Sequence, residues 1–93
     1  MDIIKISATS VPKAVAGAIA ARLSENPELE VRAVGAKAVN QAIKALIVTR
    51  TYCSKFDSDL VIQPDFTTVE NTEESIVGIK MLVRRIPLAD KEA

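Results

Sequence analysis

The sequence predicts a two-layer α/β (α+β) domain in which two helices cover one face of a mixed four-stranded sheet, in the order β-α-β-α-β-β. Its 93 residues suit one domain, and 48% hydrophobic with 26% charged residues is an ordinary globular mixture. Apolar residues alternate in four segments and recur every three or four positions in two others. Because aromatic residues make up only 3%, the core must be aliphatic.

The first two elements are a strand over residues 2–8 and the helix that follows it. The turn before the helix is typical of a helix start, because Ser10 can cap and Pro12 is tolerated in a first turn. The Asn26-Pro27 pair ends the helix. Apolar residues spaced by four predict its buried side: Val11, Val15, Ile19 and Leu23.

A second strand over residues 29–34 ends at Gly35, and the second helix begins near Ala36. At 100° per residue, the stripe expected to be buried consists of Val39, Ile43, Leu46 and Ile47. We expect this stripe to pack against strand residues of the same apolar kind: Ile4, Ile6, Val31, Ile79 and Met81. Arg50 falls on the stripe by angle, so it must lie past the core edge or extend to water.

Two further strands are expected over residues 59–66 and 75–86, joined by an acidic turn over residues 67–74. Pro64 predicts that the third strand lies at a sheet edge, because proline cannot donate to a ladder. The domain is expected to span residues 1–88, followed by a loose tail over residues 89–93.

The connections predict that the first three strands run parallel and that both helices cover the same face. The other face then carries a mixture of apolar and basic side chains: Ile3, Lys5, Arg32, Lys80, Leu82 and Arg84. Such a half-apolar face predicts a homo-oligomer.

The residue inventory excludes several functional classes. With no histidine and one cysteine, the chain lacks Cys/His zinc sites, internal disulfides and nucleophiles that need a histidine base. Metal-ligand spacing is absent, so we expect no metal, no cofactor and no enzyme activity. Cys53 is expected to act as a small hydrophobe. No apolar stretch is long enough to span a bilayer and the start lacks a signal-peptide layout, so a cytoplasmic protein without a membrane partner is expected.

Charge is balanced overall but segregated along the chain. Twelve basic and twelve acidic residues cancel, yet residues 31–56 hold five cations and no acid. Residues 57–75 hold six acids and no base. This pattern predicts one positive patch and one negative lobe, the alternative being ordinary solvated faces.

The two strand-to-helix turns, residues 7–13 and 34–37, should emerge at the same edge of the sheet. Each offers helix N-terminal N–H groups beside a lysine, Lys13 or Lys37, which together would suit a phosphate. The alternative is that each turn only caps a helix or redirects the chain. The polar pair Asn40-Gln41 could hydrogen-bond a base, a phosphate or a partner subunit, or face water.

Three stretches together resemble the stage V sporulation protein S family: residues 4–18, 33–45 and 59–67. The similarity extends over residues 3–85, and its most specific part is Gly-Ala-x-Ala-x-Asn-Gln-Ala at residues 35–42. That family is assigned to the Alba-like superfamily, which has the same β-α-β-α-β-β order.

The resemblance implies a small non-catalytic regulator of sporulation or cell division that binds nucleic acid, DNA or RNA, as a homodimer. Alba proteins use a basic loop after the first strand and the start of the second helix, which correspond here to Ser10, Pro12, Lys13, Gly35, Lys37, Asn40, Gln41 and Lys44. Alba's loop carries paired lysines before its proline, where Ser10 and Val11 stand in this chain.

Because the chain is neutral, few phosphate contacts per subunit are expected, and binding should be weak and sequence-tolerant. Two other functions stay open at this point. One is a protein-interaction module without nucleic-acid binding, and the other is a small-anion sensor or enzyme that uses the lysines at the helix starts.

Overall fold

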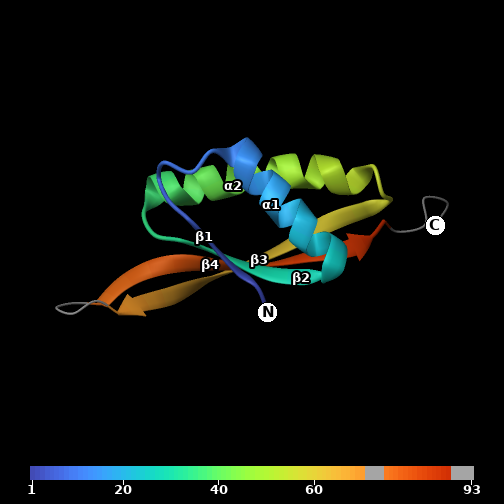
Figure 1. Ribbon diagram of the computed structural model, residues 1–93. Coiled ribbons are helices and arrows are strands. Elements are labelled where there is room, and N and C mark those ends of the chain that lie inside the picture. The colour runs from blue at the N-terminus through green and yellow to red at the C-terminus, as the bar shows by residue number, and fades with distance from the viewer. Residues whose placement is uncertain (71–74, 89–93) are drawn as a thin grey trace.

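The computed structural model describes residues 1–70 and 75–88 and has the predicted order of elements (Figure 1). The elements are β1 (Ile3–Ile6), α1 (Pro12–Glu25), β2 (Glu28–Ala33), α2 (Ala36–Ser54), β3 (Ser58–Glu70) and β4 (Ser75–Pro87). The tip of the predicted acidic turn, residues 71–74, and the predicted tail, residues 89–93, lie outside the described residues.

The four strands form one mixed sheet in the order β1-β2-β4-β3. β1 pairs parallel to β2, whereas β4 is antiparallel to both of its neighbours. The first three strands therefore run in the same direction, as predicted, although β3 pairs with β4 alone. Its place at the edge confirms the prediction from Pro64. Proline has no backbone N–H to donate, and an edge strand can leave one side of its backbone without hydrogen bonds to a neighbouring strand.

β3 is longer than the sequence suggested, since it continues through residues 67–70, which were expected to form a turn. Thr67, Thr68 and Val69 are β-branched and favour a pleated strand, which outweighs the neighbouring turn-forming residues. β2 pairs with β4 only as far as the Ala33–Ile79 pair. Beyond it, residues 67–70 and 75–78 pair only with each other and project as a hairpin arm, which stretches the molecule to 54 × 23 × 21 Å (Figure 1).

Gly78 lies where the hairpin arm leaves the body of the sheet. A Cβ atom at this position would lie 2.9 Å from Val34 Cγ2 and 3.1 Å from the Ala33 carbonyl oxygen. The arm can therefore pass this close to the end of β2 only because the residue has no side chain.

The core lies between the sheet and the two helices and is aliphatic, as the composition required. The strands supply Ile6, Leu29, Val31, Ala33, Met81 and Val83, and the helices supply Ile19, Leu23, Leu46 and several alanines. Val39 packs against this core and is half-buried. Val11, expected in the buried row of α1, is instead the exposed N-cap residue of that helix.

The buried side of α2 differs from the predicted stripe. Ile43 is 40% exposed and Ile47 is 61% exposed, so both predictions of burial are wrong. The buried residues are mostly small: Ala38, Ala42, Ala45, Leu46, Thr49 and Cys53. α1 lies close to α2 as well as against the sheet, and small side chains allow two helix axes to approach closely. α2 is therefore rotated to place its alanines inward, which leaves the isoleucines outward.

Three polar or ionisable residues of α2 lie at or near the core, and each is accommodated in a different way. The buried Thr49 hydroxyl donates to the Ala45 carbonyl oxygen at 2.9 Å, so it is satisfied within the helix. Cys53 is buried, as predicted for a small hydrophobe, and this burial raises the pKa of its thiol. Arg50 is exposed and reaches Asp59, in agreement with its predicted place beyond the core edge.

The sheet face opposite the helices is more polar than the half-apolar face that the sequence predicted. β2 contributes Glu28 and Glu30 to this face in addition to the cations. Arg84 Nε lies 3.2 Å from Glu28 Oε2, and Arg32 pairs with Glu30. These ion pairs make the face polar, so it is not by itself a reason for two copies to associate.

The packing predicts that Leu46→Ala lowers the free energy of unfolding by about 2–5 kcal/mol, because it removes a fully buried side chain. Lys44→Ala, an exposed position on the same helix, should change it by less than about 0.5 kcal/mol. Urea unfolding followed by circular dichroism measures both values. Equal midpoints for the two variants would contradict the orientation of α2.

Candidate nucleic-acid interface

The turn between β1 and α1 is held by hydrogen bonds among its own serines. The Ser7 backbone N–H donates to Ser10 Oγ at 2.9 Å, and the Ser10 N–H donates to the Ser7 carbonyl oxygen at 3.1 Å. The Ser7 and Thr9 hydroxyls also lie within 3.1 Å of each other. Ser10 does not cap the helix as expected, because its hydroxyl is turned back toward Ser7 and Val11 takes the N-cap position.

Both helices begin without a side-chain cap and without an acidic residue in the first turn. α1 starts at Pro12, whose missing N–H has no partner to lose in a first turn. α2 starts after Gly35, whose φ of 91° is readily adopted only by glycine. The N–H groups of each first turn therefore have no side-chain acceptor within their own helix start. The positive end of the helix dipole is left for an anion from outside.

One hydrogen bond joins the two helix starts. Gln41 Nε2 donates to the Ser10 carbonyl oxygen at 2.9 Å, across 31 positions of sequence. This bond fixes the β1–α1 turn against the second turn of α2. The sequence left open what the polar pair Asn40-Gln41 contacts. The Gln41 amide hydrogen-bonds within the protein, whereas the neighbouring Asn40 is exposed.

The remaining candidate residues lie on one face of α2 and at the start of α1. Lys37, Asn40 and Lys44 are exposed and are spaced by three and four positions, so they share a face with Gln41. Lys13 is exposed in the first turn of α1. The structure thus gathers the α2 candidates on one face, and the Gln41 bond ties this face to Ser10 beside Pro12 and Lys13.

Lysines and arginines have separate roles in this molecule. Every ion pair between described residues uses an arginine: Arg22–Asp2, Arg32–Glu30, Arg50–Asp59 and Arg84–Glu28. Within residues 1–70 and 75–88, no lysine takes part in an ion pair. The positive charges at the helix starts are therefore not neutralised by neighbouring carboxylates in this part of the chain.

The structure adds a hollow that the sequence analysis missed, on the open face beside the β1–α1 turn. This cavity, of about 510 Å³, is lined by the cations Lys5 and Arg32, by Ser7, Thr67 and Thr68, and by five apolar residues of the neighbouring elements. Lys5 is the register partner of Arg32, which in turn is opposite Lys80, so three cations stand side by side on adjacent strands. The alternation of each strand was visible in the sequence, but the register that aligns these cations was not.

In the part of the chain that the structure describes, no helix combines the length and the apolar character needed to cross a bilayer.

Comparison with known proteins adds the family and the fold. The model of the stage V sporulation protein S family matches residues 2–86. Among solved structures, the chain is similar to Alba from Thermoplasma volcanium, with a TM-score of 0.61 and 17% sequence identity over 90% of this chain and 98% of that one. At this identity the likeness establishes the fold alone, and it confirms the predicted Alba-like order of two helices and a mixed four-stranded sheet.

The bond between Gln41 and Ser10 predicts that Gln41→Ala lowers the free energy of unfolding by about 0.5–1.5 kcal/mol, the usual net value of one hydrogen bond. Asn40→Ala removes a similar side chain from an exposed neighbouring position and should leave stability nearly unchanged. Chemical unfolding of both variants measures the difference. If Asn40→Ala were the more damaging change, the assignment of the bond would be wrong.

Proposed function

The chain belongs to the stage V sporulation protein S family, and we propose that it is a small non-catalytic regulator in sporulation or cell-division control that binds nucleic acid as a dimer. The proposed contacts are phosphate contacts at the two helix starts. They involve Ser10, Pro12, Lys13, Gly35, Lys37, Asn40, Gln41 and Lys44, with DNA and RNA both possible as ligands.

The observation that carries the proposal is that the helix starts lack side-chain caps and that their lysines form no ion pair with any described residue. Backbone N–H groups at helix N-termini and lysine ammonium groups are common phosphate ligands in nucleic-acid complexes. Here Lys13 and Lys37 stand in the first turns of two helices that lack side-chain caps. The Gln41–Ser10 bond keeps these turns in a fixed relation, so binding would cost little ordering of the backbone.

The hollow beside the β1–α1 turn gives this surface a natural extension. Its exposed Lys5 has no ion-pair partner among the described residues, so its ammonium group is available to a phosphate. A nucleic-acid strand that is bound at the helix starts could continue into this hollow and contact Lys5. The net charge of zero nevertheless limits the number of phosphate contacts per subunit, so we expect weak binding without sequence preference.

The dimer is proposed to form at a second surface, the groove between α2 and the edge strand β3. The groove has a volume of about 280 Å³ and is lined by the exposed Ile43 and Ile47 and the half-buried Leu60 and Ile62. Isoleucine side chains left in water favour association through burial. This groove, and not the polar open face, is the apolar surface to which we assign the oligomer predicted from the sequence.

A second copy of the chain is the occupant that the charges of this groove favour. Arg50 Nε lies 2.6 Å from Asp59 Oδ1, and the bond to Arg50 holds the pKa of that carboxyl below its ordinary value. Arg50 lines the groove and is paired with Asp59 beside it, so the two charges cancel within one copy. A two-fold axis brings the same patch of both copies together, so this apolar groove can be buried against its own copy without leaving an unpaired charge. A dimer would also present two sets of helix starts to one nucleic acid.

The phosphate proposal predicts a specific change in salt dependence. On duplex DNA the logarithm of affinity should fall with the logarithm of salt concentration by about 0.9 per neutralised phosphate. Changing Lys13, Lys37 and Lys44 together to Ala should flatten this slope by about one unit per lost contact. Fluorescence anisotropy with labelled DNA and RNA measures the slope, and circular dichroism verifies that the variant folds.

A double variant, Arg22→Ala with Lys55→Ala, removes exposed cations away from the helix starts and should retain the slope of the parent. If the triple variant bound with the same slope as the parent, the site at the helix starts would be wrong. If the parent bound neither DNA nor RNA at low salt, the chain would be a protein-interaction module, the alternative that the groove between α2 and β3 favours.

The dimer proposal predicts that Ile47→Glu dissociates the protein into monomers, because the new carboxylates would be buried between the two copies. Phe66 is 72% exposed on β3 outside this groove, so Phe66→Glu is the matched control and should stay dimeric. Sedimentation velocity at micromolar concentration distinguishes the two species. Dissociation by Phe66→Glu alone, or a monomeric parent, would overturn the proposed interface.

A further inference from the structure

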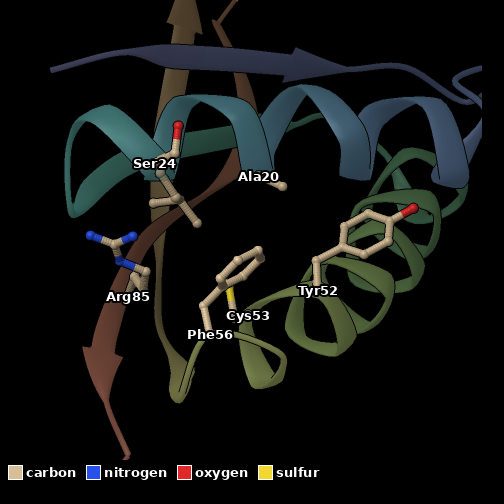
Figure 2. Close-up of a pocket in the computed structure, with 7 residues that line it drawn as sticks. Ala20, Ser24, Tyr52, Cys53, Phe56 and Arg85 are labelled. Atoms are coloured by element: carbon tan, nitrogen blue, oxygen red, sulfur yellow. The ribbon is translucent and has the colours of Figure 1, made fainter.

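A hollow between α1 and the end of α2 has no part in the proposed nucleic-acid site. Its volume is about 220 Å³, and it lies at the C-terminal ends of the two helices, away from the helix starts (Figure 2). α1 contributes Ala20 and Leu23, and the end of α2 with the turn after it contributes Tyr52, Cys53 and Phe56. Two of the three aromatic residues of the chain therefore line this one hollow.

The hollow is lined mainly by apolar and aromatic side chains. Ala20 is small and leaves space under α1, and the Ser24 hydroxyl donates to the Ala21 carbonyl oxygen at 2.6 Å instead of facing the hollow. Cys53 and Phe56 both line the hollow, and Figure 2 draws both side chains in the space below α1. Phe56 is 79% exposed, so its ring still has most of its surface available to a ligand.

One charged residue borders this apolar space. Arg85 follows Met81 and Val83 on β4 at alternate positions, and those two residues are almost completely buried against the helices. Arg85 thus continues the core-facing row of its strand to the edge of the hollow (Figure 2). Within the described residues it is the one arginine without a carboxylate partner, since the other four each form an ion pair.

We propose that this hollow binds a small aromatic carboxylate, with the ring beside Leu23, Cys53 and Phe56 and the carboxylate on Arg85. An apolar protein cavity of about 150 Å³ is large enough to hold a benzene ring, so the space here accommodates a ring with a short substituent. Aromatic rings pack favourably against one another at their edges and faces. A planar guanidinium donates two parallel hydrogen bonds to a carboxylate, and such a carboxylate would supply the counterion that Arg85 lacks in the described part of the chain.

Cys53 provides a direct readout, because it is the single thiol of the chain and lines the hollow. The probe is phenylacetate, and its neutral isostere 2-phenylethanol is the control. At a phenylacetate concentration ten times its Kd, the reaction of Cys53 with N-ethylmaleimide should slow about tenfold, because only the unoccupied protein reacts. The alcohol should protect much less.

Two variants locate the effect. Arg85→Gln should abolish the advantage of phenylacetate over the alcohol, and Ala20→Leu should fill the hollow and abolish protection by both compounds. Each labelling rate is compared with that of the same variant without ligand, and circular dichroism verifies the fold. No protection of the parent at about 10 mM, a concentration that detects even weak millimolar binding, would overturn the proposal.

Equal protection of the parent by the alcohol would overturn the carboxylate assignment. Unchanged protection in the folded Ala20→Leu variant would place the ligand elsewhere and overturn the site. None of these outcomes depends on nucleic-acid binding, so the two proposals fail independently.

Discussion

The close approach of α1 to α2 is the constraint on which the rest of the structure depends. α1 buries Ile19 and Leu23 in the core that it shares with the strands, and along its length it lies close to α2. Both helices bury alanines, Ala16 on α1 and Ala38, Ala42 and Ala45 on α2, and larger residues in such positions would force the axes apart. The rotation of α2 that this packing requires decides which of its side chains meet water, including the lysines and the two exposed isoleucines.

The same constraint explains which sequence predictions succeeded. The order of the elements, the edge position of β3 and the start of α2 at Ala36 follow from local patterns, and the structure has all three. The orientation of α2 does not follow from a local pattern, because an amphipathic argument assigns burial to the largest apolar residues. Ile43 and Ile47 are exposed since the inner positions need small side chains, and that need arises only when a second helix is present.

The candidate site was predictable in part for a similar reason. Two parallel strands place their following turns at the same edge of a sheet, so the pairing of the helix starts could be inferred from connectivity. The Gln41–Ser10 bond, the turned hydroxyl of Ser10 and the alignment of Lys5 with Arg32 depend on tertiary placement and strand register. The separation of paired arginines from unpaired lysines among the described residues is likewise visible only when side chains are in place.

The hairpin arm gives the acidic part of the sequence a physical role of its own. Beyond the Ala33–Ile79 pair the arm is a two-stranded ribbon whose strands pair with no third strand among the described residues, and it carries exposed apolar side chains at Val69 and Val77. A ribbon of this kind is a template on which strands of other molecules can add and begin an aggregate. The sequence from residue 67 to residue 78 holds three glutamates and no cation, which gives neighbouring ribbons the same sign of charge. Like charges of this kind oppose strand addition between molecules.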